Sequence, residues 1–295
     1  MTSRLVLGAA GFGKLTRSEV STLLGTALEC GIIRIDTAHG YEGSEERIGR
    51  FLKTNNQFEV NSKVGLPDPS IFTPVGIRLS VEDSLRRLGI EQLGTLFVHS
   101  LHAKYLTDEN IEAMCLLRKQ GKIKKLGYAG DGNNLSEAVK ILSISDFMFT
   151  FNIIDQSNFE VIQRAPSNAN IYYKLAMGQA IWTSLKWSSR IKSNKLVRFL
   201  FGKPPVPETW ADYCIRFNQF RSEIDDEDYS ASFLRFALFS GSAKQFVVLG
   251  THSQQHIRDA VEIEQEQMNP KALEIVRYEE LWTRKSSPTW KAHNG

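Results

Sequence analysis

Four side chains in this sequence carry the chemical groups that the reduction of a carbonyl requires. They are Asp36, Tyr41, Lys63 and His99, and three of them close a short run of strand-like residues. Each run is typical of a buried strand and is followed by a helical pattern. Because the carboxyl ends of parallel strands meet at one rim in an α/β barrel, we expect the four side chains to converge there.

The expected chemistry assigns one role to each group. A carbonyl that accepts a hydride becomes an alkoxide and needs a proton, which a tyrosine such as Tyr41 can supply. A free tyrosine has a pKa of about 10, and a neighbouring ammonium such as that of Lys63 stabilises the phenolate. Asp36 can keep that ammonium charged, and the His99 imidazole can hydrogen-bond the substrate oxygen. Taken singly, each residue also fits a structural role as a cap, loop residue, solvated charge or core histidine; taken together, they favour catalysis.

The elements that must position these residues alternate between strand and helix along the chain of 295 residues. This alternation predicts an α/β fold, a (β/α)8 TIM barrel with right-handed crossovers. The expected strands are residues 4–7, 31–36, 58–64, 95–98, 124–129, 147–151, 170–175 and 245–249. The expected helices are residues 17–30, 108–120, 135–142, 158–164 and 226–240, with three more that begin at residues 44, 73 and 253. Thr16 with Glu19, and Thr73 with Pro74, are typical helix starts.

We expect residues 1–295 to form a single barrel domain with two additions. The segment at residues 177–224 is too long for an ordinary connection. Its aromatic and basic residues suit either a lid over an anionic cofactor or substrate, with Trp182 as a substrate contact, or a helical surface insertion. The tail at residues 269–295 is expected to pack an outer helix on the barrel.

Bulk composition argues against several other classes of protein. The net charge is only +3 and there is no long basic run, so nucleic-acid binding has no support. Cys30, Cys115 and Cys214 are scattered without zinc-type spacing, which predicts reduced thiols in a cytoplasmic protein and no metal site. Because no apolar stretch reaches membrane length and a strand begins at once, we expect neither a membrane span nor a signal peptide. The expected partner is a small-molecule carbonyl substrate.

Four stretches of the chain resemble motifs of the aldo-keto reductase superfamily. DTAHGYEGSE at residues 36–45 is similar to DTAxxYGxSE, and LRRLGI at residues 85–90, followed by His99, is similar to SLxRLxxDxxDLxxxH. QGKIKKLG at residues 120–127 is similar to GKIRxIG, and VVLGTHSQQHI at residues 247–257 is similar to VVxGTxSPEHL. The order and spacing agree from about residue 5 to about residue 265.

The resemblance implies that Tyr41 is the acid, that Lys63 and Asp36 tune it, and that His99 orients the carbonyl. It also implies a nicotinamide dinucleotide cofactor without a Rossmann fold, NADP(H) in preference to NAD(H). The turn at residues 8–13 is similar to GTxxFG, and the turn after the last strand leads into a helix start that suits a phosphate. The implied cofactor contacts are Gly8, Ala9, Asp36, Lys174, Leu175, Gly250, Thr251, His252 and His256, and the implied substrate contacts are Tyr41, His99 and Trp182, with Trp290 a weaker candidate.

Several positions depart from the family pattern. Ala129-Gly130 stands where Ser-Asn often holds the carboxamide, Met148 where a Gln commonly ends the sixth strand, and Lys174 where an aromatic residue or Arg is usual. His256 replaces a common Arg and Ala260 a common Asn. These changes remove usual cofactor contacts and leave the choice between NADP and NAD open, although His256 and Arg258 can still meet a 2′-phosphate.

Three interpretations of the chain compete. The first is an NAD(P)H-dependent reductase of an aldehyde, ketone or sugar-like carbonyl; residues 152–156 and the short N-terminus resemble a bacterial branch linked to surface-polysaccharide synthesis. The second is a non-catalytic regulatory protein that binds nicotinamide cofactors on the same barrel. The third is an aldolase with Lys63 as Schiff base, which the match at Tyr41 and His99 opposes.

Overall fold

The computed structural model describes residues 3–178, 217–218, 228–240 and 244–266, and these form a closed barrel of parallel strands. Each strand pairs with the next along the chain, and β1 pairs with β8 to close the barrel. The strands are β1 (Leu5–Gly8), β2 (Arg34–Asp36), β3 (Glu59–Val64), β4 (Leu93–His99), β5 (Ile123–Ala129), β6 (Asp146–Thr150), β7 (Asn170–Lys174) and β8 (Gln245–Gly250). The TIM-barrel prediction is confirmed.

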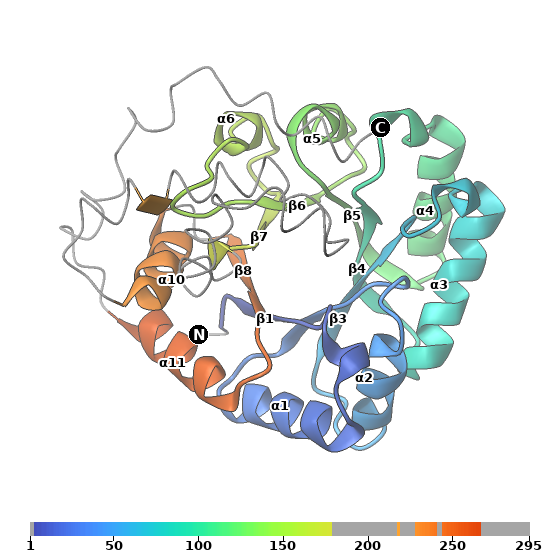
Figure 1. The fold of residues 1–295 in the computed structure, drawn as a ribbon. Coiled ribbons are helices and arrows are strands. Elements are labelled where there is room, and N and C mark those ends of the chain that lie inside the picture. Colours follow the sequence, from blue (N-terminus) through green and yellow to red (C-terminus); the bar gives the residue numbers. More distant parts are fainter. Residues whose placement is uncertain (1–2, 179–216, 219–227, 241–243, 267–295) are drawn as a thin grey trace, which may run out of the picture.

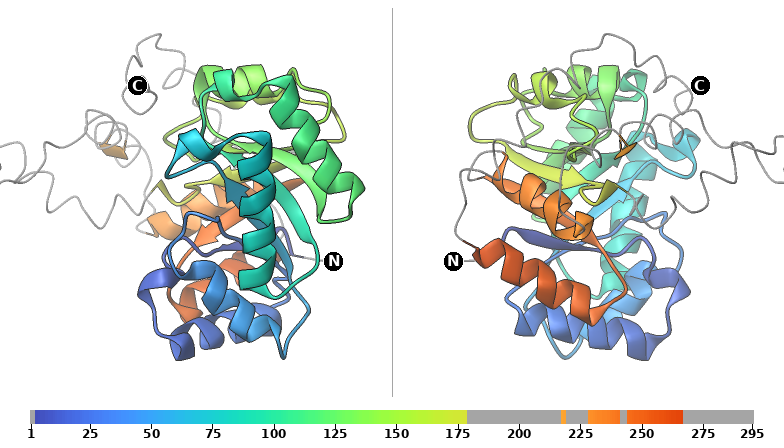
Figure 2. Two further views of the ribbon diagram at one scale, coloured as in Figure 1. Left: turned by 90° about the vertical axis from the view of Figure 1, so that its right-hand side faces the viewer. Right: turned by 60° about the vertical axis from the view of Figure 1, so that its left-hand side comes forward.

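The helices lie outside the strands (Figures 1 and 2). They are α1 (Arg17–Glu29), α2 (Ser44–Leu52), α3 (Pro74–Leu88), α4 (Asp108–Lys119), α5 (Gly132–Ala138), α6 (Phe159–Ile162), α10 (Tyr229–Phe239) and α11 (Gln254–Gln265). Short 3-10 turns occur at η1 (Phe12–Lys14), η2 (Pro69–Ile71) and η3 (Ala103–Tyr105). None of the helices in the described ranges is long and apolar enough to cross a membrane.

Both predicted capping sites are confirmed. The Thr16 hydroxyl accepts a hydrogen bond from the Glu19 N–H, and the Glu19 carboxylate accepts one from the Thr16 N–H at 2.7 Å, which completes a capping box at the start of α1. Thr73 caps α3 by accepting from the Gly76 N–H, with Pro74 as the first helical residue.

Several predicted boundaries are wrong; β4 begins at Leu93 rather than at residue 95, and α5 ends at Ala138 rather than at residue 142. β2 begins at Arg34 because Gly31, in the left-handed region at φ 79°, and Ile32 close α1 by donating backbone hydrogen bonds to its last turn. α5 begins at Gly132, one turn earlier than expected, where the Asn158 side chain accepts from the Gly132 N–H at 2.8 Å. α6 has four residues, Phe159–Ile162, rather than the expected span of residues 158–164.

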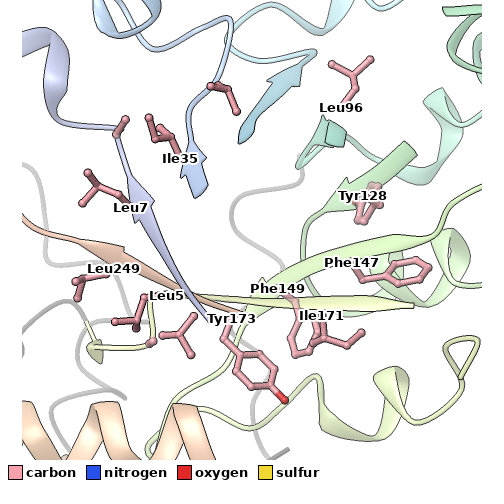
Figure 3. Close-up of a cluster of buried hydrophobic side chains, with 14 of the residues drawn as sticks. Leu5, Leu7, Ile35, Leu96, Tyr128, Phe147, Phe149, Ile171, Tyr173 and Leu249 are labelled. Carbon is pink, nitrogen blue, oxygen red and sulfur yellow. The ribbon is translucent and has the colours of Figure 1, made fainter. Parts of the chain in front are cut away.

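Strand alternation divides the core into two layers. Side chains such as Leu5, Leu7, Ile35 and Phe147 point away from the barrel axis and pack beneath the helices (Figure 3). The intervening positions fill the barrel interior with a separate apolar cluster that contains Val6, Phe97, Ala129, Met148 and Tyr172. Since the interior is packed with side chains, a ligand must bind at a rim.

The two predicted additions fall largely on residues that the structure does not describe. Of the segment at residues 177–224, only residues 177–178 and 217–218 are described, and the tail at residues 269–295 is not. Trp182 and Trp290 therefore lie outside the described residues, as does Cys214, and the single-domain organisation stays a prediction. Cys30 and Cys115 are free thiols.

Candidate active site

The structure brings the four predicted site residues together at the C-terminal rim of the barrel. Asp36 ends β2, Lys63 is the penultimate residue of β3, His99 ends β4, and Tyr41 lies in the loop between β2 and α2. The Lys63 Nζ lies 2.6 Å from Asp36 Oδ2 and 5.0 Å from the centroid of the Tyr41 ring. The Tyr41 and His99 rings meet edge to face, with centroids 5.6 Å apart and planes at 84°.

Lys63 is the centre of this arrangement. Its ammonium is buried and donates to Asp36 Oδ2 and, at 2.8 Å, to the Thr37 carbonyl oxygen. Burial lowers the pKa of the Lys63 amine, but the charges of Asp36 and Tyr41 and hydrogen bonds with both outweigh it and raise the pKa above its ordinary value. Burial raises the pKa of Asp36, and Lys63 and Lys174 oppose that rise. Because the amine starts from a far higher pKa than the carboxyl, the shared proton stays on Lys63 and the pair is ionic.

His99 is held in its neutral form. Burial, followed by the charges of Lys63 and Lys174, lowers the pKa of its imidazole to about 3. Its Nδ1 is buried and has no hydrogen-bond partner within the described part of the chain. A neutral imidazole carries one N–H, which can hydrogen-bond an incoming oxygen without placing a second full charge beside Lys63.

Small residues form the seam between β1 and β8 beside this group. Gly8 is in register with Asp36 on one side and Gly250 on the other, and the Ala9 N–H donates to the Asp36 carbonyl at 2.8 Å. A Cβ added at Gly250 would meet no atom of the described part of the chain within 4 Å. The seam is therefore open at Gly250, whereas at Gly8 an added Cβ would lie 3.0 Å from Val248 Cγ1.

A polar residue at the opposite side of the rim, Thr150, was missed by the sequence analysis. β6 ends at Thr150, so Met148 does not reach the rim and instead belongs to the apolar interior of the barrel. Thr150 is in register with Lys174, and its hydroxyl is buried without a partner among the described residues. Counting two positions on from Met148 would have identified it, since inward-facing residues alternate along a strand.

Lys174 forms an ion pair that the sequence did not reveal. Its Nζ lies 2.8 Å from Asp131 Oδ2, while Asp131 Oδ1 accepts from the Thr150 N–H at 2.6 Å and the Asn158 side chain at 3.0 Å. Leu175 follows with φ 53°, a conformation that non-glycine residues rarely adopt. The structure thus places Lys174 and Leu175 at the rim, with the amine bound to Asp131.

In the turn after β8, several polar groups form hydrogen bonds with one another. The Thr251 hydroxyl accepts from the Ser253 N–H and lies 3.1 Å from His256 Nδ1, and the Ser253 hydroxyl accepts from the His256 N–H. The His252 ring covers Gly11, where an added Cβ would lie 2.2 Å from its Nε2. These residues lie together at the start of α11, but two of the backbone donors expected to meet a phosphate are already bound.

The site fits a nicotinamide ring on physical grounds. Asp36 Oδ1, His99 Nδ1 and Thr150 Oγ1 are buried at one rim without partners in the described residues, and the glycine seam lies beside them. Buried polar atoms are costly when unpaired, so such a group is typical of a site that binds a polar ligand. Among the described residues, no group of three or more His, Cys, Asp or Glu side chains is placed to hold a metal ion.

Comparison with known proteins identifies relatives over part of the chain. A D-threo-aldose 1-dehydrogenase from a Pseudomonas species is 30% identical over 168 residues, which cover 45% of this chain and 50% of the relative. The NADH-specific methylglyoxal reductase of Escherichia coli (strain K12) is 29% identical over 173 residues, covering 51% of this chain and 53% of the relative. The chain thus spans about half the length of these curated relatives.

Solved structures share the fold over nearly the whole chain. The aldo/keto reductase from Klebsiella pneumoniae in complex with NADP and acetate has a TM-score of 0.68 at 17% identity, covering 93% of this chain and 90% of that one. The family model described as "Aldo/keto reductase family" matches residues 4–278. The chain therefore belongs to the aldo/keto reductase family.

Proposed function

We propose that the protein is a nicotinamide-dependent oxidoreductase that reduces a carbonyl group, with Tyr41 as the proton donor. The observation that carries this proposal is the position of the buried Lys63 ammonium between the Asp36 carboxylate at 2.6 Å and the Tyr41 ring at 5.0 Å. A positive charge in that position stabilises a phenolate. The edge-to-face contact between the Tyr41 and His99 rings allows both side chains to reach the same substrate oxygen.

Each residue has a defined part in the proposed reaction. When bound, the nicotinamide cofactor supplies the hydride that reduces the carbonyl carbon. The His99 N–H binds the carbonyl oxygen as negative charge develops on it, and the Tyr41 hydroxyl gives its proton to that oxygen. Lys63 stabilises the resulting phenolate until solvent returns a proton to it, while Asp36 keeps Lys63 charged and fixed in place.

The cofactor is proposed to lie along the glycine seam. The open position at Gly250 leaves room for a flat ring next to Gly8, Ala9 and Asp36, with Lys174 and Leu175 at its edge and Thr251, His252 and His256 toward the phosphates. We propose NADP(H) as the first cofactor, because His256 and Arg258 can meet a 2′-phosphate. Arg258 is shared with Glu29 at 3.3 Å, which weakens that contact and keeps NAD(H) as the second candidate.

The proposed substrate is a small carbonyl compound with polar substituents, such as an aldose or a dicarbonyl. The rim opposite Tyr41 carries Thr150, Lys174 and Asp131, which can hydrogen-bond hydroxyl or carbonyl groups beside the reacting carbon. The names of the two curated relatives, an aldose dehydrogenase and a methylglyoxal reductase, agree with this class.

The proposal is tested by titrating the protein with NADPH and with NADH, followed by a carbonyl panel of aldoses, dicarbonyls and aromatic aldehydes. Binding is followed by the change in protein and nicotinamide fluorescence. We expect saturable binding and turnover of at least one carbonyl class. Binding without turnover across the panel would instead support the regulatory interpretation, and absence of binding of both cofactors would contradict both.

A further inference from the structure

We propose that Arg87, on α3 outside the barrel, is a positioning residue that holds Tyr41 against Lys63 through the buried carboxylate of Glu45. This inference rests on the proposed role of Tyr41 as the proton donor. It concerns a cluster of ionic side chains on α2 and α3 beside the β2–α2 loop, defined here as Glu45, Glu46, Asp83 and Arg87.

The β2–α2 loop that carries Tyr41 is short and tied at several points. Lys63 Nζ donates to the Thr37 carbonyl at 2.8 Å, and the His39 N–H donates to the Lys63 carbonyl at 2.9 Å. The Ser44 N–H donates to the Tyr41 carbonyl at 3.0 Å, which links the loop directly to the first turn of α2. Any movement of that first turn must therefore move the Tyr41 backbone.

The first turn of α2 is anchored by a carboxylate that solvent does not reach. Glu45 has an exposed fraction of 0%, and its Oε1 accepts from the Ser62 hydroxyl at 2.8 Å. Burial raises the pKa of Glu45 above its ordinary value, and hydrogen bonds from Ser62 and Ser84 and the charges of His39 and Arg87 only partly oppose that rise. A buried carboxylate in this position is costly unless it is paired.

Arg87 supplies that pair and also reaches the loop itself. Its Nη1 lies 3.5 Å from Glu45 Oε2 and donates to the His39 carbonyl at 3.3 Å. Its Nε lies 3.4 Å from Glu46, and its Nη2 lies 2.5 Å from Asp83. The planar guanidinium thus binds the loop before Tyr41 and the helix after it at the same time, which a single ammonium cannot do with the same geometry.

β3 connects the Glu45 contact outside the barrel with the Lys63 contact inside it. Ser62 and Lys63 are consecutive, so their side chains point to opposite faces of the strand. Ser62 holds Glu45 on the helix side, and Lys63 holds Asp36 on the barrel side. Glu45, Ser62 and Arg87 therefore fix the distance between the loop that carries Tyr41 and the strand that carries Lys63.

The test is Arg87→Met, which keeps the aliphatic length and removes the guanidinium. We expect kcat for carbonyl reduction to fall by about 10- to 100-fold, because a small misplacement of a reacting group has an effect of this size. The KM for the carbonyl and the Kd for NADPH should stay near the parent values, since no residue of the cluster is among the proposed cofactor or substrate contacts. Arg87→Lys, which restores only the charge, should recover part of kcat.

Arg86→Met is the matched control. Arg86 is the neighbouring residue on the same helix, its side chain is 74% exposed, and among the described residues it forms an ion pair only with Asp83. This variant should keep the parent kcat. If Arg87→Met does not fold, Glu45→Gln replaces it, because glutamine retains the shape and the Ser62 contact while losing the charge that Arg87 binds.

Two results would overturn the positioning role. The first is a kcat for Arg87→Met equal to that of Arg86→Met. The second is a fall in kcat accompanied by equal increases in the KM for the carbonyl and the Kd for NADPH. A parent protein that binds NADPH but reduces no carbonyl would contradict the proposed function instead. In that case Arg87 has no proton donor to position, and the inference falls with it.

Discussion

A buried ammonium needs neighbouring groups that stabilise its charge, and at Lys63 these include Asp36 and the Tyr41 hydroxyl. Both members of the Asp36–Lys63 pair are nearly inaccessible to solvent, with exposed fractions of 4% and 3%. Removing one partner leaves the other charge without compensation in a site that water does not reach. The same two residues that act in the proposed reaction therefore also contribute to the stability of the fold.

Lys63→Met should lower the free energy of unfolding by about 3–5 kcal/mol, the usual result of breaking a buried ion pair. The double variant Asp36→Asn with Lys63→Met should recover a large part of this loss because no buried charge remains. Urea denaturation of the parent, both single variants and the double variant measures the coupling. Additive effects of the two substitutions would contradict a coupled pair.

His99 should make the stability of the protein depend on pH. The pKa of its imidazole is lowered to about 3 by burial, whereas in the unfolded chain it is about 6.5. The unfolded state therefore binds a proton that the folded state excludes. The contribution is complete above pH 6.5 and is lost as the pH falls toward 3, with a slope of at most about 1.4 kcal/mol per pH unit.

This effect is measured as the free energy of unfolding of the parent and of His99→Gln at pH 7 and pH 5. The parent should lose more stability than the variant between these two values. Equal losses would show that His99 does not titrate as the buried site requires.

At the scale of the element, the loop between β2 and α2 has little room to change. A Cβ added at Gly40 would lie 2.3 Å from the Leu66 carbonyl oxygen, so Gly40→Ala must displace the loop that carries Tyr41. Gly25 in α1 is a matched control, because a Cβ there meets no described atom outside its own helix backbone within 4 Å. Comparing alanine substitutions at the two glycines therefore distinguishes a steric requirement of the β2–α2 loop from the general preference of a helix for alanine over glycine.

Gly25→Ala should raise the free energy of unfolding by about 0.5–1 kcal/mol, as expected for glycine replaced within a helix. Gly40→Ala should lower it by about 1–3 kcal/mol, as overpacking usually does, and should lower kcat in addition. Thermal unfolding and steady-state kinetics of both variants test this. A Gly40→Ala variant with parent kcat would show that the loop tolerates displacement.

Sequence reasoning succeeded where the determinants are local and failed where they are distant. Thr16 and Thr73 could be identified as caps because their partners lie three residues away, and the strand ends at Asp36 and His99 follow from short runs. The start of α5 could not, because it depends on Asn158, which is distant in the chain. The same limit hid the Lys174–Asp131 pair, whose members meet only across the rim.

At the scale of the whole molecule, barrel closure creates the seam on which the proposed cofactor site depends. β1 pairs with both β2 and β8, which places Gly8 between Asp36 from early in the chain and Gly250 from near its end (Figure 1). The eightfold alternation of the sequence predicted this closure, but not how much open space the seam would contain. That space is a property of the closed barrel rather than of any one segment.

Gly250→Val should fill the seam without disturbing the fold, since a Cβ there meets no atom of the described residues within 4 Å. At a concentration of NADPH 100 times its Kd, the parent should gain about 2.7 kcal/mol in free energy of unfolding. The variant should match the parent without cofactor and lose most of that gain. Thermal unfolding with and without NADPH decides the matter, and an undiminished gain would place the cofactor elsewhere.

The most direct measurement of the central claim is single-turnover reduction of a carbonyl by Tyr41→Phe preloaded with NADPH, followed by loss of nicotinamide absorbance. Phenylalanine keeps the ring that meets His99 and lies near Lys63 and removes only the hydroxyl. We predict that NADPH binds as in the parent while the rate of reduction falls about 100-fold or more, the contribution of a positioned general acid. A rate equal to that of the parent would contradict the account.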